Sequence, residues 1–142
     1  MTLLQRNFEI KARDFSRAGE VSIEVQRILK TVGFDAKHIR RASICAYESE
    51  MNVVMHGGDG KMILTLDPEH INLDVKDDGP GIEDIELALQ EGYSTASLEY
   101  REMGFGAGMG LPNIKRNADL FEIQSEKGKG VCLKIAIHVR EN

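Results

Sequence analysis

Glycine is concentrated in one stretch of this 142-residue chain, and that stretch limits which folds are open to it. Residues 79–110 hold half of the 14 glycines and show no sustained apolar period. Glycine favours turns and close backbone approach over helix or strand interiors, so the stretch is predicted to be mostly loop. A loop this long inside a compact domain is usually functional. Regular structure must therefore come from the segments on either side.

Periodic apolar residues on both sides of this loop predict a sheet and a set of helices. Apolar residues that alternate with polar ones predict strands at 8–12, 61–66, 71–75, 120–124 and 131–139. A helical apolar period predicts helices at 21–32, 35–56 and 111–118. This order fits a layered α+β domain with helices on one sheet face. Because 142 residues is a usual domain size, residues 1–142 are expected to form a single domain.

Charge and apolar content exclude several classes of partner. The 18 Lys and Arg against 23 Asp and Glu give a net charge of −5 without a run of like charges, which argues against nucleic-acid binding. The sequence has no stretch of about 18 apolar residues that would span a membrane. Cys45 and Cys132 lack metal or redox spacing and are expected to be buried free thiols. We therefore expect a cytoplasmic protein.

The second predicted helix carries Glu48 and Asn52 four residues apart, on one face and one turn from each other. A carboxylate there can accept a proton, and an amide oxygen suits Mg²⁺. Such a pair is usually only a solvated face, but Cys45 and Val53 make this an apolar helix in which polar side chains need a reason. Glu50 lies about 160° around the helix from Asn52, so it is expected to affect the chemistry little.

A tight turn, Asp77-Asp-Gly79-Pro-Gly81, directly follows a predicted strand. Its two glycines let the backbone approach a ligand closely, and a carboxylate at the strand end can accept hydrogen bonds. An ordinary surface turn is the alternative interpretation. The turn is therefore a candidate binding element rather than proof of one.

Four glycines at alternate positions, 104, 106, 108 and 110, precede the last predicted helix. Successive backbone N–H groups there can cradle a phosphate, and a helix N-terminus favours an anion. The spacing matches neither the dinucleotide-binding nor the Walker motif, and a flexible linker is the alternative. Lys115 follows about one turn later and is a candidate phosphate contact, although single basic residues more often lie on a solvated face.

These three blocks stand in the order found in a known superfamily. From about Phe8 to Val139 the sequence resembles the GHKL superfamily of ATPases and kinases, which includes gyrase and the histidine kinases. Residues 48–57 resemble its N-box, 77–81 its first glycine box and 104–110 its second. The resemblance implies a histidine-kinase-type ATP-binding fold. This is a two-layer α/β sandwich with a mixed, mostly antiparallel sheet, helices on one face and a glycine-rich ATP lid.

The resemblance also implies ATP or ADP and Mg²⁺ as ligands, with a role for each block. Asn52 becomes the Mg²⁺ ligand, Glu48 the general base and Asp77 the acceptor of a hydrogen bond from the adenine amino group. Gly79 and Gly81 would allow the adenine to approach closely. The phosphates are expected to contact the lid residues Gly104, Gly106, Gly108 and Gly110 and, beyond them, Lys115.

The sequence departs from the family pattern at one position. Relatives often carry threonine after the last glycine turn, whereas Val131 follows Gly130 here. A hydroxyl-mediated contact to the base is therefore not expected, and a water held by Asp77 can replace it.

Two segments resemble one branch of the superfamily, the bacterial anti-sigma factors and switch kinases. They are Arg40–Glu48 and Gly110–Arg116, and Gly128–Gly130 adds a further likeness to the stressosome-type switch kinases. Members of this branch are serine/threonine kinases that phosphorylate small STAS-domain antagonists. The implied partners are such an antagonist and, as further candidates, a sigma factor or a phosphatase.

Three functions stay open: a protein serine/threonine kinase, an anti-sigma factor that sequesters a sigma factor, and a simple ATP hydrolase. A histidine kinase is not expected, because its phospho-accepting hairpin needs tens of residues before the nucleotide domain. Here only residues 1–7 precede the first predicted strand. That strand, if exposed at a sheet edge, is expected to permit pairing with another subunit, which makes a homodimer a further prediction.

Overall fold

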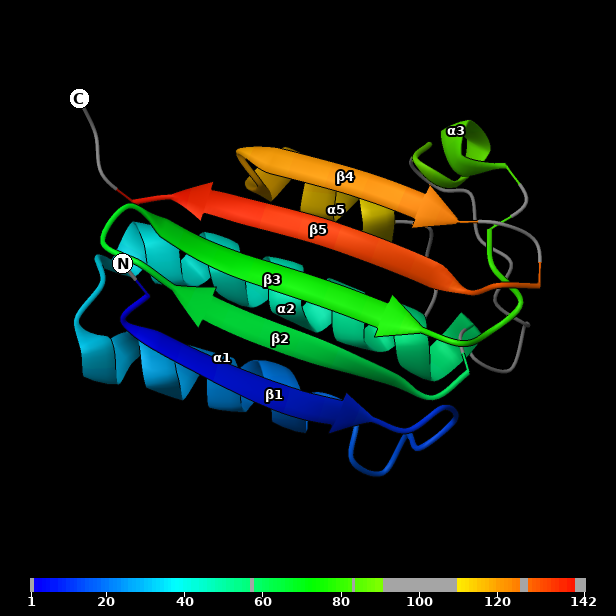
Figure 1. Ribbon diagram of the computed structural model, residues 1–142, viewed down its shortest axis with the longest axis horizontal. Coiled ribbons are helices and arrows are strands. Elements are labelled where there is room, and N and C mark those ends of the chain that lie inside the picture. The colour runs from blue at the N-terminus through cyan, green and yellow to red at the C-terminus, as the bar shows by residue number, and fades with distance from the viewer. Residues whose placement is uncertain (1, 57, 83, 91–109, 126–127, 140–142) are drawn as a thin grey trace.

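The structure is a computed structural model that describes residues 2–56, 58–82, 84–90, 110–125 and 128–139. Five strands form one sheet: β1 Leu4–Ile10, β2 Gly60–Leu66, β3 His70–Asp77, β4 Leu120–Ser125 and β5 Val131–His138 (Figure 1). Their order in the sheet is β1-β2-β3-β5-β4. Each of these four pairings is antiparallel, so the sheet predicted to be mixed and mostly antiparallel is antiparallel throughout its described strands.

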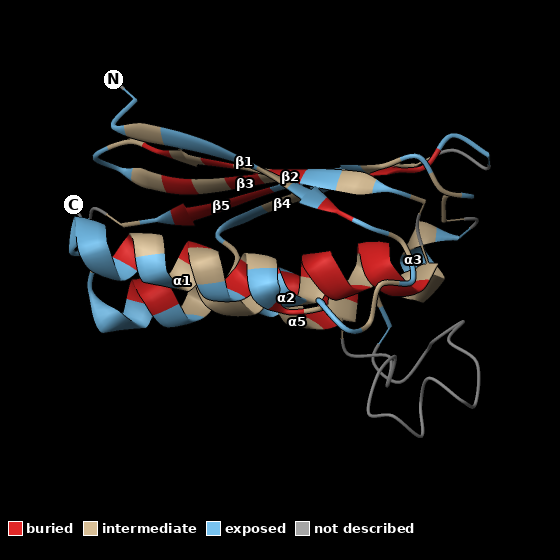
Figure 2. Cartoon of the chain, turned by 90° about the horizontal axis from the view of Figure 1, so that it is seen from below, coloured by how far each residue is buried: buried red, intermediate tan, exposed pale blue. Residues whose placement is uncertain are grey.

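The helices form a second layer, which confirms the predicted α+β fold class. They are α1 Glu20–Val32, α2 Ala36–His56, α3 Ile85–Ala88 and α5 Gly110–Asn117. Figure 2 shows the strands in one layer and α1, α2 and α5 along one face of it. The short α3 interrupts the stretch that was predicted to be mostly loop, and its Asp84 cap accepts a hydrogen bond from Leu87 N. Within the described ranges, no helix is both long and apolar enough to cross a membrane.

The core lies between the two layers, where the two apolar periods meet. Alternate residues of β2 and β3 are at most 2% exposed and point at the helices, namely Met62, Leu64, Leu66, Ile71, Leu73 and Val75. From the helix layer, Val25 and Leu29 of α1 and Ala42 of α2 are fully buried. Period two in the strands and period 3.6 in the helices therefore bury one face of each, as the sequence predicts.

The first strand is displaced from its predicted position at 8–12. β1 pairs with β2 from Leu4 opposite Leu66 to Ile10 opposite Gly60, where the partner strand begins. Beyond that point Ala12 N donates to the Asp59 carboxylate instead of to a strand. Arg13 then takes a left-handed backbone conformation, with φ 65, that turns the chain away from the sheet.

Arg13 closes the C-terminal end of α2. Its backbone N–H donates to Val54 O at 2.9 Å, and its guanidinium donates to Met55 O. The last carbonyl groups of a helix have no partner inside the helix, so these bonds satisfy two of them. The end of α2 that follows Asn52 is therefore held by the loop after β1.

Glu50 holds the same half of α2 against α1. It is 2% exposed and accepts hydrogen bonds from three backbone N–H groups, those of Gly19 at 3.0 Å, Val21 at 3.3 Å and Ser22 at 3.0 Å. The N-cap residue of α1 is Gly19, which has no side chain to cap the helix. Glu50 supplies the missing acceptor, and a negative charge at a helix N-terminus is stabilising. Sequence analysis placed Glu50 away from Asn52 but missed this role.

We expect Glu50→Gln to destabilise the fold. The amide keeps one acceptor oxygen but turns an NH₂ group towards backbone N–H groups, which costs about 1.5–3 kcal/mol of unfolding free energy. Urea denaturation measures the change. Glu20→Gln is the matched control, because Glu20 is an exposed acid in the first turn of the same helix. Equal unfolding midpoints for the two variants would show that Glu50 is not the cap of α1.

Candidate functional site

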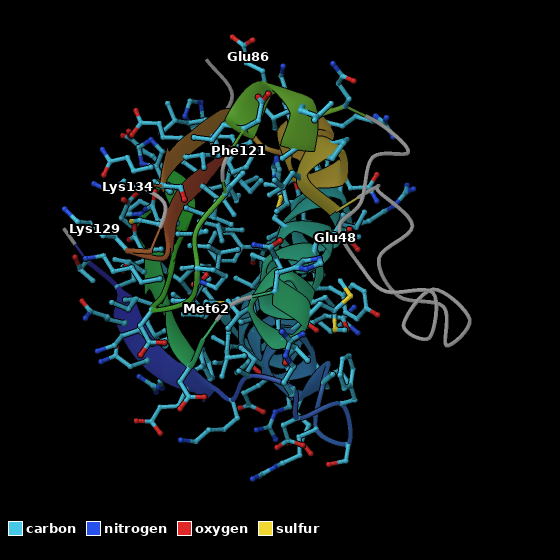
Figure 3. The ribbon with its side chains drawn as sticks, turned by 90° about the vertical axis from the view of Figure 1, so that its right-hand side faces the viewer. Glu48, Met62, Glu86, Phe121, Lys129 and Lys134 are labelled. Atoms are coloured by element: carbon cyan, nitrogen blue, oxygen red, sulfur yellow. The ribbon has the colours of Figure 1, made fainter. Side chains whose placement is uncertain are left out.

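Helix α2 presents Glu48 and Asn52 one turn apart, both half-buried. Glu48 lies in the helix layer, on the other side of the molecule from Lys134 of β5 (Figure 3). Burial raises the pKa of Glu48, and a side-chain hydrogen bond with Asn113 of α5 opposes that rise. A carboxylate suits a general base when its pKa is raised but a hydrogen bond still favours its ionised form. Asn113 was not predicted, because nothing in the sequence links α5 to Glu48.

Asn113 is expected to control the pH at which Glu48 is ionised. Asn113→Leu removes the hydrogen bond that lowers the pKa of Glu48, so that pKa rises further. A base works only when ionised, so the acid limb of any reaction that needs Glu48 should move to higher pH. Carboxyl NMR titration of Glu48 measures this directly. Asn113→Asp, which replaces a donor with a like charge, should raise the pKa more, and a lowered pKa in either variant would contradict the assignment.

Asp77, the last residue of β3, is held by three backbone N–H groups. Its Oδ1 accepts from Gly79 N at 2.9 Å, and its carboxylate also accepts from the N–H groups of Val131 and Gly58. Burial raises the pKa of Asp77 despite these bonds, and the neighbouring Asp78 adds to the rise. A carboxylate has about four lone-pair positions, so roughly one remains for a ligand donor. This fits recognition of a single N–H group, as the adenine role requires.

Two glycines keep the backbone close around Asp77. Gly81 has φ +83, in the left-handed region that side chains disfavour. Gly130 has φ +81, and a Cβ built on it would lie 2.0 Å from Asp77 O. The turn before β5 therefore packs directly on the end of β3, which leaves no space for any side chain at position 130.

Ser125 of β4 ties the glycine turn to the last hairpin. Its Oγ accepts from Ile82 N at 2.7 Å and donates to Gly130 O at 3.0 Å. Gly128 N also donates to Pro80 O at 2.7 Å. Sequence reasoning missed Ser125, since a serine at a strand end has no distinctive signal. The turn is thus fixed from both sides by segments far away in the chain.

The fold brings the described parts of the three predicted blocks to one end of the molecule. A Cβ built on Gly60 would lie 3.0 Å from Val53 Cγ1 and 3.2 Å from Asp77 Cβ, so the residue after Asn52 lies beside Asp77. A Cβ built on Gly110, the first residue of α5, would lie 3.4 Å from Glu48 Oε2. Helix α2 therefore lies beside Asp77 and beside Gly110, the described residue of the second glycine block.

Four other residues are predicted to contact the phosphates of the nucleotide. Gly104, Gly106 and Gly108 lie outside the described residues. Lys115 is exposed on α5, two positions after Asn113 and therefore about 200° from it around the helix. Its phosphate contact stays a prediction.

The two cysteines are free, as expected, but they are buried to different extents. Cys45 is buried, and burial raises the pKa of its thiol to about 12, while Cys132 is half-buried. A thiol with such a pKa is not a nucleophile near neutral pH. Cys45 is therefore a packing residue.

The donor set fits a magnesium nucleotide better than a metal held by protein alone. In the described part of the chain, no group of three or more His, Cys, Asp or Glu residues could hold a metal ion. Mg²⁺ commonly binds through one or two protein oxygens together with phosphates and waters. Asn52, half-buried on α2, can supply such an oxygen. Asn52 would hold the metal, and Asp77 the base of the nucleotide.

The chain is similar to several known proteins. Residues 12–137 match the family described as "Histidine kinase-like ATPase domain". The chain is 28% identical over 109 residues to the serine/threonine-protein kinase RsbT of Bacillus subtilis (strain 168), covering 74% of this chain and 76% of that protein. It is 33% identical over 97 residues to an anti-sigma F factor of Thermoanaerobacter sp. (strain X514), covering 65% of this chain and 64% of that factor.

Proposed function

The chain belongs to the histidine kinase-like ATPase family, and from that premise we propose that it transfers the γ-phosphoryl group of ATP to a serine or threonine of a protein partner. ATP binding follows from the family, whereas the acceptor is our inference. The observation that carries it is Glu48, a half-buried carboxylate with a raised pKa, one turn before Asn52. A hydrolase needs only water, but the kinase name of one relative favours a hydroxyl acceptor.

Each residue has a separate task in the proposed reaction. Asp77 and the glycine turn bind the adenine, and Asn52 holds Mg²⁺, which neutralises phosphate charge when bound. Glu48 accepts the proton of the acceptor hydroxyl. The oxygen of that hydroxyl forms the new bond to the γ-phosphorus while the bond between the γ-phosphorus and ADP breaks. Asn113 orients the Glu48 carboxylate. Positioning and electrostatics do most of the work in such transfers, so small shifts of α2 should matter.

We propose a STAS-domain antagonist as the acceptor, in a bacterial partner-switching system in the cytoplasm. The names of the relatives support this branch, as one is a serine/threonine-protein kinase and the other an anti-sigma factor. The second relative also supports an alternative function, nucleotide-dependent sequestration of a sigma factor. A phosphatase partner, a single domain over 1–142 and a homodimer stay predictions. β1 lies at one edge of the sheet, where a second subunit would pair.

One experiment separates the three functions. The purified chain is mixed with γ-³²P-ATP, Mg²⁺ and either a STAS-domain antagonist or a sigma factor from the same genome. Label on a serine or threonine of the antagonist supports the kinase. Stable retention of the sigma factor without label supports sequestration, and phosphate release without either supports the hydrolase. The last two outcomes would each overturn the kinase proposal.

A further inference from the structure

A groove of about 870 Å³ runs along the outer side of the helix layer and ends at Glu48. Helix α2 forms its floor, α1 one wall, and Asn113 and Asn117 of α5 the other. Neither Asn52 nor Asp77 lines it. Asn52 follows Glu48 along α2, whereas the groove extends back towards the start of α2, so Glu48 stands between the nucleotide-binding residues and the groove.

The lining of the groove changes in character along its length. The end far from Glu48 carries Lys30 of α1 and Arg40 of α2, for which no ion pair is found among the described residues. Exposed apolar side chains line the groove beside Glu48, with Ile23 66% and Tyr47 40% exposed. Among the described residues of the lining, Glu48 is the acidic one. A positive end in a chain with net charge −5 is a local feature that favours an acidic ligand.

Resting on the proposed function, we propose that this groove is the docking surface for the acceptor protein, and that it selects an acceptor segment with an acidic residue away from the phosphorylated hydroxyl. The acidic residue pairs with Arg40 and Lys30, apolar side chains cover Ile23 and Tyr47, and the hydroxyl reaches Glu48. The three properties of the groove then match three parts of one segment.

The helix geometry sets the spacing that the acceptor needs. Glu48 lies eight positions after Arg40, which is about 12 Å along α2 at 1.5 Å per residue. An extended segment covers that distance with about four residues, and a helical one with about eight. The acidic residue is therefore expected about four or about eight positions from the acceptor serine or threonine.

Charge reversal in the groove tests the docking surface. Arg40→Glu and Lys30→Glu are compared with Lys61→Glu, which reverses an exposed lysine of β2 on the far side of the sheet. The probe is the purified STAS-domain antagonist, with transfer rates measured against its concentration and ATP affinity measured by calorimetry. We expect the KM for the antagonist to rise about tenfold in each groove variant, with kcat and ATP affinity within twofold of the parent. Lys61→Glu should match the parent.

Failure of the groove proposal can be told apart from failure of the kinase proposal. The groove would not be the docking surface if the KM for the antagonist were unchanged in Arg40→Glu, or if it rose as much in Lys61→Glu as in Arg40→Glu. If the parent transfers no phosphate, binding of the antagonist is measured by calorimetry instead. Weaker binding of the antagonist by Arg40→Glu and Lys30→Glu, with binding by Lys61→Glu unchanged, would then support the groove while rejecting the kinase. Equal binding by all three variants and the parent would reject both. If Arg40→Glu weakened binding of a sigma factor but not of the antagonist, the acceptor assignment would also be overturned.

Discussion

Glu48→Gln is expected to lower phosphoryl transfer by about 10²- to 10⁴-fold, the usual contribution of a general base, while ATP binding is retained. The glutamine keeps the size of the side chain and can still contact Asn113, but it cannot accept the proton of the acceptor hydroxyl. Single-turnover transfer to the antagonist measures the rate, and calorimetry the ATP affinity. Glu48 makes no hydrogen bond to the described backbone like those of Glu50, so the fold should be preserved.

Asn52→Ala is the contrasting variant. Asn52 is proposed to hold Mg²⁺, so its loss should damage binding of the magnesium nucleotide as well as transfer. Loss of transfer without loss of nucleotide binding indicates a base, whereas loss of both indicates a metal ligand. If Glu48→Gln lost ATP binding as severely as Asn52→Ala, the division of tasks along α2 would be wrong.

Asp77→Asn is expected to weaken nucleotide binding by about 10- to 150-fold, which corresponds to roughly 1.5–3 kcal/mol. The carboxylate of Asp77 accepts from three backbone N–H groups and offers its remaining position to the ligand. An amide has one acceptor oxygen and two donors, so it meets at least one N–H group with a donor. Calorimetry with ADP measures the loss, and thermal unfolding shows how much of it comes from a weakened turn.

Asp74→Asn is the control for this measurement. Asp74 lies on the same strand but three residues earlier, and alternation along β3 places it on the face away from the helices. Its substitution removes the same charge without touching the turn, and ADP affinity should stay within twofold. Unchanged ADP affinity in a folded Asp77→Asn variant would remove Asp77 from the adenine site.

The fold class, most of the elements and the residues proposed for the centre of the site can be read from the amino-acid sequence alone. Apolar periods of two and 3.6 depend only on local geometry, so they located the strands and helices to within a few residues. Glu48 and Asn52 are joined by one helical turn, and Asp77 and Gly79 by one tight turn. Such short spacings are visible in a linear sequence because local backbone geometry decides them.

The distant groups that support those residues are set by the packing of the assembled fold. Glu50 caps a helix that begins 30 residues earlier in the chain, Asn113 of α5 reaches Glu48 of α2, and Ser125 fixes the turn at Ile82. Each is an ordinary polar residue whose partner is set by packing of two layers rather than by spacing. The groove beside Glu48 has the same origin, since three separate helices enclose it. Burial turns these residues from solvated side chains into obligatory hydrogen-bonding partners, and burial is a property of the assembled fold.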